Sequence, residues 1–135
     1  MKLAERFASE AEKLRGTPFR LLGRDPSTGL DCIGLATCAL ERAGGSARAP
    51  SAYRLRNLDI GDFIGCAPRS GLRGARGPVL RGDLVLTRPG PAQHHLLVSL
   101  GEALFVHAHA GLGRVVIQPL REDWPILHHW RLSAD

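Results

Sequence analysis

The sequence lacks any hydrophobic run long enough to cross a membrane, which needs about 18 to 20 consecutive apolar residues. Its first residues also lack the apolar core of a signal peptide, because charged side chains interrupt them. These side chains are Lys2, Glu5, Arg6, Glu10, Glu12 and Lys13. We therefore expect a protein that starts in the cytoplasm and makes no membrane contact.

Cysteines are few, and no two of them form a C-x-x-C pair. There are three, at Cys32, Cys38 and Cys66. An odd number without that spacing argues against a disulfide scaffold and against a zinc knuckle. Cys38 follows Cys32 by six residues, about 240° around a helix, so the two thiols should point in different directions.

Aromatic residues make up only 5% of the chain, and lysine is nearly absent. The net charge of +5 comes almost wholly from arginine, which would attract polyanions. A nucleic-acid site usually interleaves clustered basic residues with aromatics, so this composition argues against nucleic-acid binding. An anionic polymer other than nucleic acid is the better polyanionic partner, although arginine-rich composition is also typical of GC-rich genomes.

A chain of 135 residues with 44% apolar content predicts one globular domain over residues 1–135. Periodicity predicts helices at 2–15 and 32–43, loops at 17–30 and 69–78, and a helical turn from Leu58 to Ile64. From residue 82 onwards the chain is predicted to be mostly strand. The expected strands are 83–87, 94–100, 104–109, 114–119 and 127–132. This order indicates an α+β domain, with N-terminal helices packed on a mostly antiparallel sheet of about five strands.

Cys32 follows Asp31 at the point where a polar, turn-rich segment becomes apolar and helix-forming. Aspartate is a favoured N-cap, so Asp31 is expected to start a helix whose first residue is Cys32. The helix dipole and the free N–H groups there favour thiolate, which predicts a lowered cysteine pKa. The simpler alternative is that Cys32 is a small buried hydrophobe.

A group of histidines follows about sixty residues later, around a predicted β-hairpin that turns at Gly101-Glu102-Ala103. Its register would place His95 opposite either His109 or His107. In both cases His95, His107 and His109 share one face of the sheet, and His94 takes the other. Alternatively, these histidines are satisfied core residues or lie exposed at the hairpin edge.

Together, a helix-start cysteine and clustered imidazoles are the parts that thiol-based nucleophilic catalysis needs. One imidazole accepts the thiol proton, and a second group orients that imidazole. This chemistry needs no metal and no organic cofactor.

Four blocks of the chain resemble the motifs of the NlpC family of cell-wall cysteine peptidases, over roughly residues 3–133. Their order and spacing match the family pattern. The blocks are Gly16-Thr17-Pro18-Phe19 through Gly29-Leu30-Asp31-Cys32-Ile33-Gly34-Leu35, then Arg81-Gly82-Asp83-Leu84, then His95-Leu96-Leu97-Val98-Ser99-Leu100-Gly101, and finally Phe105-Val106-His107-Ala108.

The resemblance implies a compact papain-like fold and assigns roles by position. Cys32 would be the nucleophile, His95 the base and His107 the residue that orients the base. His109 is the alternative candidate for the orienting role. Asp31 is expected to cap and shape the site rather than carry a proton. The implied reaction hydrolyses an amide in the peptide stem of peptidoglycan, typically between D-glutamate and a diamino acid.

Three positions depart from the family pattern. Phe19 stands where the family usually has tyrosine, and the loss of one oxyanion-type donor can cost ~10²–10³ in rate. Tyr53, the only tyrosine, is a candidate substitute. Ile33 replaces the common serine and resembles the branch associated with phage tails and gene-transfer particles. Leu97 replaces a glycine and is expected to narrow the cleft.

The sequence thus predicts a peptidoglycan peptidase associated with a phage tail or similar particle, with tail proteins as partners. Two alternatives remain open. One is a structural tail-assembly protein with a degenerate site, and the other is a related amidase or acyltransferase that acts on a small acyl substrate.

Overall fold

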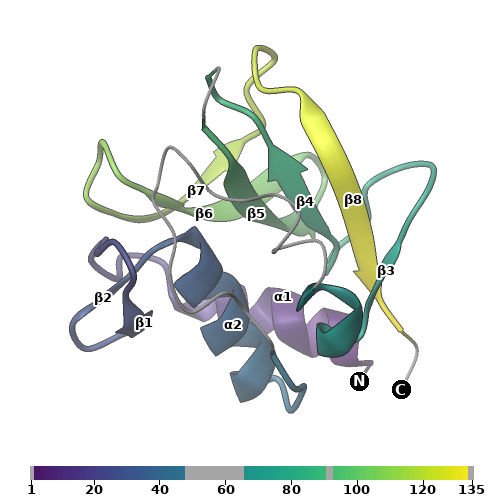
Figure 1. Cartoon of the computed structure of the whole chain (residues 1–135), viewed down its shortest axis with the longest axis horizontal. Coiled ribbons are helices and arrows are strands. Elements are labelled where there is room, and N and C mark those ends of the chain that lie inside the picture. The colour runs from purple at the N-terminus through teal and green to yellow at the C-terminus, as the bar shows by residue number, and fades with distance from the viewer. Residues whose placement is uncertain (1, 48–65, 91–92, 134–135) are drawn as a thin grey trace.

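Two α-helices lie on one side of a six-stranded antiparallel sheet in the computed structural model of the chain (Figure 1). The structure describes residues 2–47, 66–90 and 93–133, and these statements concern those residues. Neither helix has the length and apolar character that would let it cross a bilayer. The elements in chain order are α1 (Leu3–Lys13), β1 (Arg24–Asp25), β2 (Gly29–Leu30), α2 (Cys32–Arg42), the 3₁₀ helix η1 (Pro68–Ser70), β3 (Leu72–Gly74), β4 (Leu84–Thr87), β5 (His95–Gly101), β6 (Leu104–His109), β7 (Arg114–Pro119) and β8 (Ile126–Leu132).

The six strands of the main sheet follow the order β3-β8-β4-β5-β6-β7, and β1 pairs with β2 in a separate small hairpin. All pairs of neighbouring strands are antiparallel. The two expected helices and the five expected strands are present, with their ends moved by no more than two residues. The α+β prediction is therefore confirmed, with six strands in the main sheet rather than about five.

The sixth strand, β3, corrects the prediction of a loop over 69–78. Leu72 is buried there, and β3 pairs with the end of β8 through Leu72 and Leu132. The Gly- and Arg-rich sequence of this segment has no alternation of apolar and polar residues that would predict a strand. The segment is a strand because it pairs with β8. The expected loop at 17–30 likewise contains the β1–β2 hairpin. The helical turn predicted from Leu58 to Ile64 lies outside the described residues.

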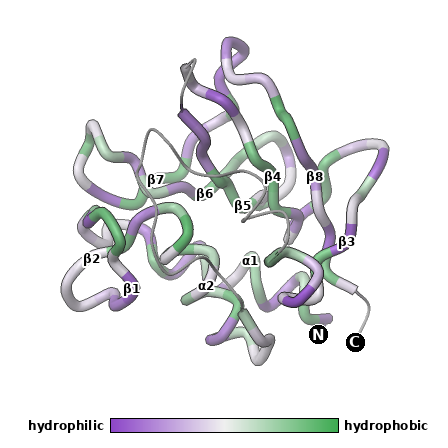
Figure 2. Tube along the Cα trace, viewed as in Figure 1, coloured by the Kyte–Doolittle hydropathy of each residue, from purple (hydrophilic) through white to green (hydrophobic). Residues whose placement is uncertain are grey.

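The main core lies between the helices and the sheet, because alternate residues of the strands point towards α1 and α2. On β5, Leu96 and Val98 belong to this core, whereas Leu97 packs on the other side of the sheet with Val85 and Phe105. In Figure 2, β4 and β5 become more hydrophilic towards the end of the sheet at which β5 begins. His95 is at this end, on the same side of the strand as Leu97.

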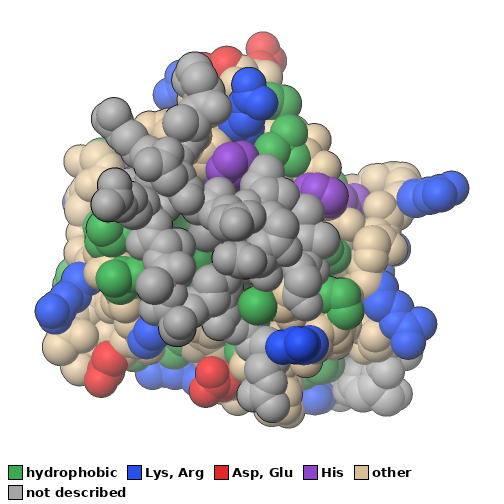
Figure 3. Space-filling view, viewed as in Figure 1, with side chains coloured by type: hydrophobic (Ala, Val, Ile, Leu, Met, Phe, Trp, Pro, Cys, Tyr) green, Lys and Arg blue, Asp and Glu red, His purple; other side chains and the backbone are tan. Residues whose placement is uncertain are grey.

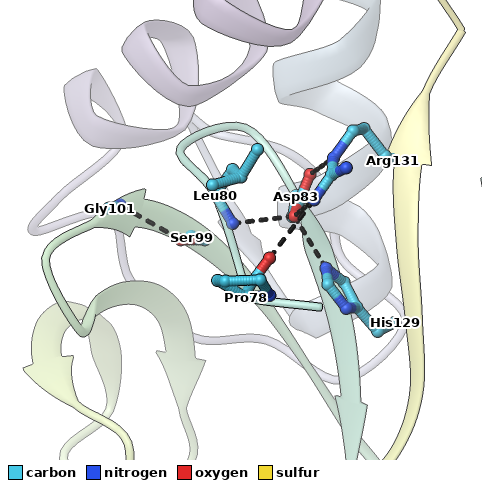
Figure 4. A network of polar contacts seen from close by, with 7 residues as sticks. All are labelled: Pro78, Leu80, Asp83, Ser99, Gly101, His129 and Arg131. Atoms are coloured by element: carbon cyan, nitrogen blue, oxygen red, sulfur yellow. Dashed lines mark hydrogen bonds and ion pairs between the residues drawn. The ribbon is translucent and has the colours of Figure 1, made fainter. Parts of the chain in front are cut away.

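A buried carboxylate joins β8 to the start of β4 (Figure 4). Asp83 is fully buried and accepts hydrogen bonds from His129 Nε2 at 2.7 Å and from Arg131 Nε at 2.9 Å. It also accepts one from the Leu80 amide, and Arg131 reaches the Pro78 carbonyl. The partners on Asp83 outweigh its burial and lower the pKa of the Asp83 carboxyl. This network fixes β8 against the start of β4.

Candidate active site

The start of α2 is built around the buried carboxylate of Asp31. One oxygen accepts the Gly34 amide at 2.8 Å, which is an N-cap bond, and the other accepts the Leu22 amide at 2.8 Å. Arg24 adds an ion pair at 3.2 Å. The prediction that Asp31 caps the helix is confirmed. The same carboxylate also ties the preceding loop to the helix.

Glycines allow this loop and helix to approach each other closely. A Cβ on Gly34 would lie 1.9 Å from the Gly23 carbonyl oxygen, and a Cβ on Gly23 would lie 2.2 Å from the Gly29 carbonyl oxygen. No larger residue fits at either position without moving the backbone. These contacts give a physical reason for the glycines that surround the Asp31-Cys32 pair.

Cys32 is the first residue of α2, and its side chain is buried. Burial raises the pKa of the Cys32 thiol to about 12, and the neighbouring Asp31 charge adds to this rise. The Leu96 and Ile33 amides act in the opposite direction by donating hydrogen bonds to the sulfur. The expected lowering of the Cys32 pKa was therefore wrong. The helix start does favour the thiolate, but the loss of solvent outweighs that effect.

The Leu96 amide places the Cys32 sulfur at the beginning of β5. This amide nitrogen belongs to the peptide bond that follows His95, so the sulfur lies beside the His95 backbone. Among the hydrogen bonds of the described residues, none links the thiol to the His95 imidazole. Cys32 and His95 are thus neighbours in the fold, contributed by α2 and β5.

The hairpin register brings the histidines to one face of the sheet, as predicted. Val98 pairs with Val106 and Ser99 with Phe105, and a bulge follows at Gly101. In each of these two pairs the residue numbers have the same even sum. Continuing this pairing to the start of β5 places His95 opposite His109. Since side chains alternate along each strand, His95 and His107 lie on the same face and meet diagonally.

His95 and His107 form a buried hydrogen-bonded pair. His95 Nε2 lies 2.9 Å from His107 Nδ1, and His107 Nε2 lies 2.9 Å from Gln118 Oε1 on β7. Burial lowers the pKa of His95 to about 3, and the neighbouring His107 contributes to this fall. Burial also lowers the pKa of His107, against the hydrogen bond to Gln118 that raises it. Both rings are consequently neutral at pH 7.

The other two histidines play different parts. His109 accepts the Leu112 amide on Nδ1 at 3.0 Å, and its ring lies 5.5 Å from that of His107, tilted by 42°. His109 therefore contacts the pair without bonding to His95. His94 was expected on the opposite face, but it precedes β5 and lines the same pocket as His95. Strand alternation does not decide its direction.

The pocket beside these imidazoles is lined by the start of β5, the end of β6, the residues next to these two strand ends, and Trp124. The Trp124 ring meets both His95 and His107 edge to face, with centroids 5.8 Å apart in each case. Figure 3 shows histidine side chains in the upper half of one molecular face, with Lys and Arg side chains scattered over the same face. Sequence reasoning missed Trp124 and Gln118, because nothing near either residue in the chain signals a site.

Phe19, Leu97 and Tyr53, which the sequence suggested could affect the site, have different outcomes in the structure. Phe19 is half-buried against the main core and has no hydroxyl to offer. Leu97 was expected to narrow the cleft, but it is buried under Trp124 with Val85 and does not line the pocket. Tyr53 lies outside the described residues.

The remaining thiols stand apart from this arrangement. Cys38 and Cys66 are both half-buried and free, and Cys38 packs at the edge of the main core. Within residues 2–47, 66–90 and 93–133, no three His, Cys, Asp or Glu side chains are grouped so as to hold a metal ion.

The fold and the geometry of the site define the class of protein. A cysteine opens a helix that packs on an antiparallel sheet, and the sheet carries a hydrogen-bonded histidine pair. This is the papain-like α+β architecture. The chain belongs to the NlpC/P60 family, whose model matches residues 16–132. Members of this family are cysteine peptidases and cell-wall hydrolases.

Solved structures share this fold at low sequence identity. NlpC2 from Trichomonas vaginalis is 19% identical with a TM-score of 0.71, over 99% of this chain and 47% of its own. The peptidoglycan hydrolase RipB from Mycobacterium tuberculosis is 23% identical with a TM-score of 0.64, over 98% and 65%. The NlpC/P60 domain of the peptidoglycan hydrolase SagA is 24% identical with a TM-score of 0.62, over 96% and 97%.

This chain therefore spans less than half of NlpC2 but nearly all of the SagA domain. No curated protein matches the sequence significantly.

Proposed function

We propose that this chain is a cysteine peptidase that hydrolyses an amide bond in the peptide stem of peptidoglycan. One observation carries the proposal: the helix-start thiol of Cys32 lies beside β5, the strand that carries the buried His95–His107 pair. Membership of the NlpC/P60 family supplies the class of substrate. RipB and SagA, both named as peptidoglycan hydrolases, support the same class.

The proposed reaction begins when the Cys32 sulfur attacks the carbonyl carbon of the scissile amide. Because burial keeps the thiol protonated and the imidazole neutral, the proton passes from sulfur to His95 as the C–S bond forms. The negative charge develops on the carbonyl oxygen, where the Cys32 backbone N–H at the helix start can donate a hydrogen bond. His107 holds the His95 ring in place during this transfer.

Collapse of the tetrahedral intermediate breaks the C–N bond, and His95 returns its proton to the leaving amine. The product is a thioester between Cys32 and the acyl part of the substrate. Water then attacks this thioester and His95 accepts a proton from it. Breakage of the C–S bond releases the carboxylic acid and restores the thiol. No step uses a metal or a cofactor.

The bond that we favour joins D-glutamate to the diamino acid of the stem. We further propose that the protein acts as part of a phage tail or a gene-transfer particle. Ile33 motivates this second proposal, since a bulky aliphatic residue replaces the common serine after the cysteine. In this chain Ile33 is fully buried in the main core, so it fills space that a serine would leave open.

The test is digestion of purified stem peptides that contain a γ-D-glutamyl-diamino acid bond, with product masses read by mass spectrometry. Cleavage at that bond is expected, and Cys32→Ala should abolish it. Cys38→Ala is the matched control, because it makes the same chemical change on the same helix without touching the site. If both variants cleave as well as the unmodified protein, Cys32 is not the nucleophile.

A structural role in tail assembly is the second candidate, and Phe19 favours it, because this residue lacks the hydroxyl that the family usually offers at that position. Under this alternative, particles that carry Cys32→Ala would assemble and infect normally, and the stem peptide would remain intact. Simple acyl esters should be included in the digestion, since their turnover without cleavage of the stem peptide would instead indicate an acyltransferase or a small-substrate amidase.

A further inference from the structure

A chain of three hydrogen-bonded side chains crosses the sheet and ends on an amide. His95 on β5 bonds to His107 on β6, which bonds to Gln118 on β7, with both distances at 2.9 Å. The two imidazoles are buried, and Gln118 is half-buried. Antiparallel pairing holds β6 against β7 in continuous register, so the amide is fixed relative to the His107 ring.

The chemistry of the last atom decides where the protons lie. The Gln118 Oε1 atom can only accept, so His107 Nε2 must carry a proton. In the neutral ring, His107 Nδ1 is then an acceptor, and His95 Nε2 must donate to it. Nδ1 of His95 is left without a proton. Both rings are neutral at pH 7, because burial lowers the pKa of each.

We propose that Gln118 is a positioning residue that sets the tautomer of both histidines and leaves Nδ1 of His95 free to accept the thiol proton. This inference rests on the proposed hydrolase function for its consequence, but the tautomers themselves do not depend on it. An amide turned by 180° would donate to His107 Nε2. Each proton would then shift to the other nitrogen, and His95 Nδ1 would be blocked.

In the part of the chain that the structure describes, this relay of hydrogen bonds runs through His95, His107 and Gln118. The His109 ring contacts that of His107, but the hydrogen bond that the structure gives it is the one that Nδ1 accepts from the Leu112 amide. The Trp124 ring packs edge to face against both imidazoles. The indole N–H is not hydrogen-bonded to either imidazole nitrogen within the part of the chain that the structure describes.

Three substitutions at Gln118 test whether the residue must accept a hydrogen bond from His107 Nε2 or donate one to it. Gln118→Glu only accepts and should preserve the tautomers, with kcat on stem peptide within about tenfold of the unmodified protein. Gln118→Met neither donates nor accepts, so the tautomers mix and kcat falls by roughly 10–10². Gln118→Lys only donates and should reverse the relay, with kcat down by up to ~10⁴ and KM little changed. Glu122→Gln, on an exposed side chain, controls for the added positive charge.

Nitrogen-15 NMR of histidine-labelled protein reads the tautomers directly, whether or not the protein hydrolyses anything. We expect the unmodified protein to carry its protons on Nε2 of both His95 and His107, and Gln118→Lys to move them to Nδ1. Protons on Nδ1 in the unmodified protein would overturn the proposal. Equal loss of kcat in the Glu and Lys variants, with unchanged melting temperatures, would also overturn it. The expected tautomers without any stem-peptide cleavage would support the relay and reject the hydrolase function.

Discussion

Replacing Asp31 with alanine should destabilise the whole start of α2, and the structure gives the size of the effect. The substitution removes the cap on Gly34, worth about 1 kcal/mol. It also leaves the Leu22 amide without its carboxylate partner, which costs about 1–3 kcal/mol. Arg24 is about a third exposed and regains water, so its lost ion pair adds at most ~1 kcal/mol. The total is a loss of about 2–5 kcal/mol in the free energy of unfolding.

The assay is thermal and urea unfolding of the purified protein, followed by circular dichroism. For a domain of this size, the loss corresponds to a fall in Tm of roughly 10 °C. Asp31→Asn is the matched comparison, because its one amide oxygen can keep the Gly34 cap while its NH2 group cannot accept a hydrogen bond from the Leu22 amide. Its loss of stability should be smaller than that of Asp31→Ala by about the 1 kcal/mol of the cap.

Two results would refute this reasoning. A free energy of unfolding for Asp31→Ala within ~0.5 kcal/mol of the unmodified protein would show that the carboxylate does not organise the helix start. Loss of hydrolysis in Asp31→Asn at full stability would show that Asp31 takes part in proton transfer rather than in capping.

Three further perturbations test other parts of the structure. Gly34→Ala forces a Cβ against the Gly23 carbonyl and should cost about 2 kcal/mol or more, whereas Gly74→Ala has open space and should be nearly neutral in the same urea titration. Asp83→Asn should lower stability by roughly 2–4 kcal/mol at pH 7. The pKa of Asp83 is lowered in the folded state, so its contribution is present above the unfolded pKa of about 3.9 and is lost as pH falls through the folded pKa. With a pKa of about 12, Cys32 has a thiolate fraction on the order of 10⁻⁴ at pH 8. Cys32 should therefore react with iodoacetamide far more slowly than Cys66 at that pH, which peptide mass spectrometry can measure.

Each of these has a contrary outcome. Equal unfolding midpoints for the two glycine variants would mean that the loop can move away from α2. The difference in Tm between Asp83→Asn and the unmodified protein should shrink as the pH falls below 3. If this difference stays constant there, the charge of the Asp83 carboxylate is not the cause of the lost stability. Labelling of Cys32 with a midpoint below pH 8 would mean that the neighbouring imidazole stabilises the thiolate more than burial opposes it.

Local patterns in the sequence predicted the helices, the five longer strands and the pairing of the histidine hairpin. These features depend on neighbouring residues: the apolar period of 3.6 or 2, the Asp31 cap, and a turn at Gly101 that fixes the register. Strand β3 escaped prediction because its glycine and arginine residues carry no such period, and only pairing with β8 makes it a strand.

The sequence by itself determined the kinds of chemical group in the site and the elements that carry them, because helix capping and strand alternation act over a few residues. Only the tertiary structure decided the protonation and partners of those groups. Burial raised the pKa of the Cys32 thiol against the helix dipole, and the pairing of β6 with β7 put Gln118 against His107. Solvent exclusion and contacts between distant strands depend on the whole packed domain, so no local pattern encodes them.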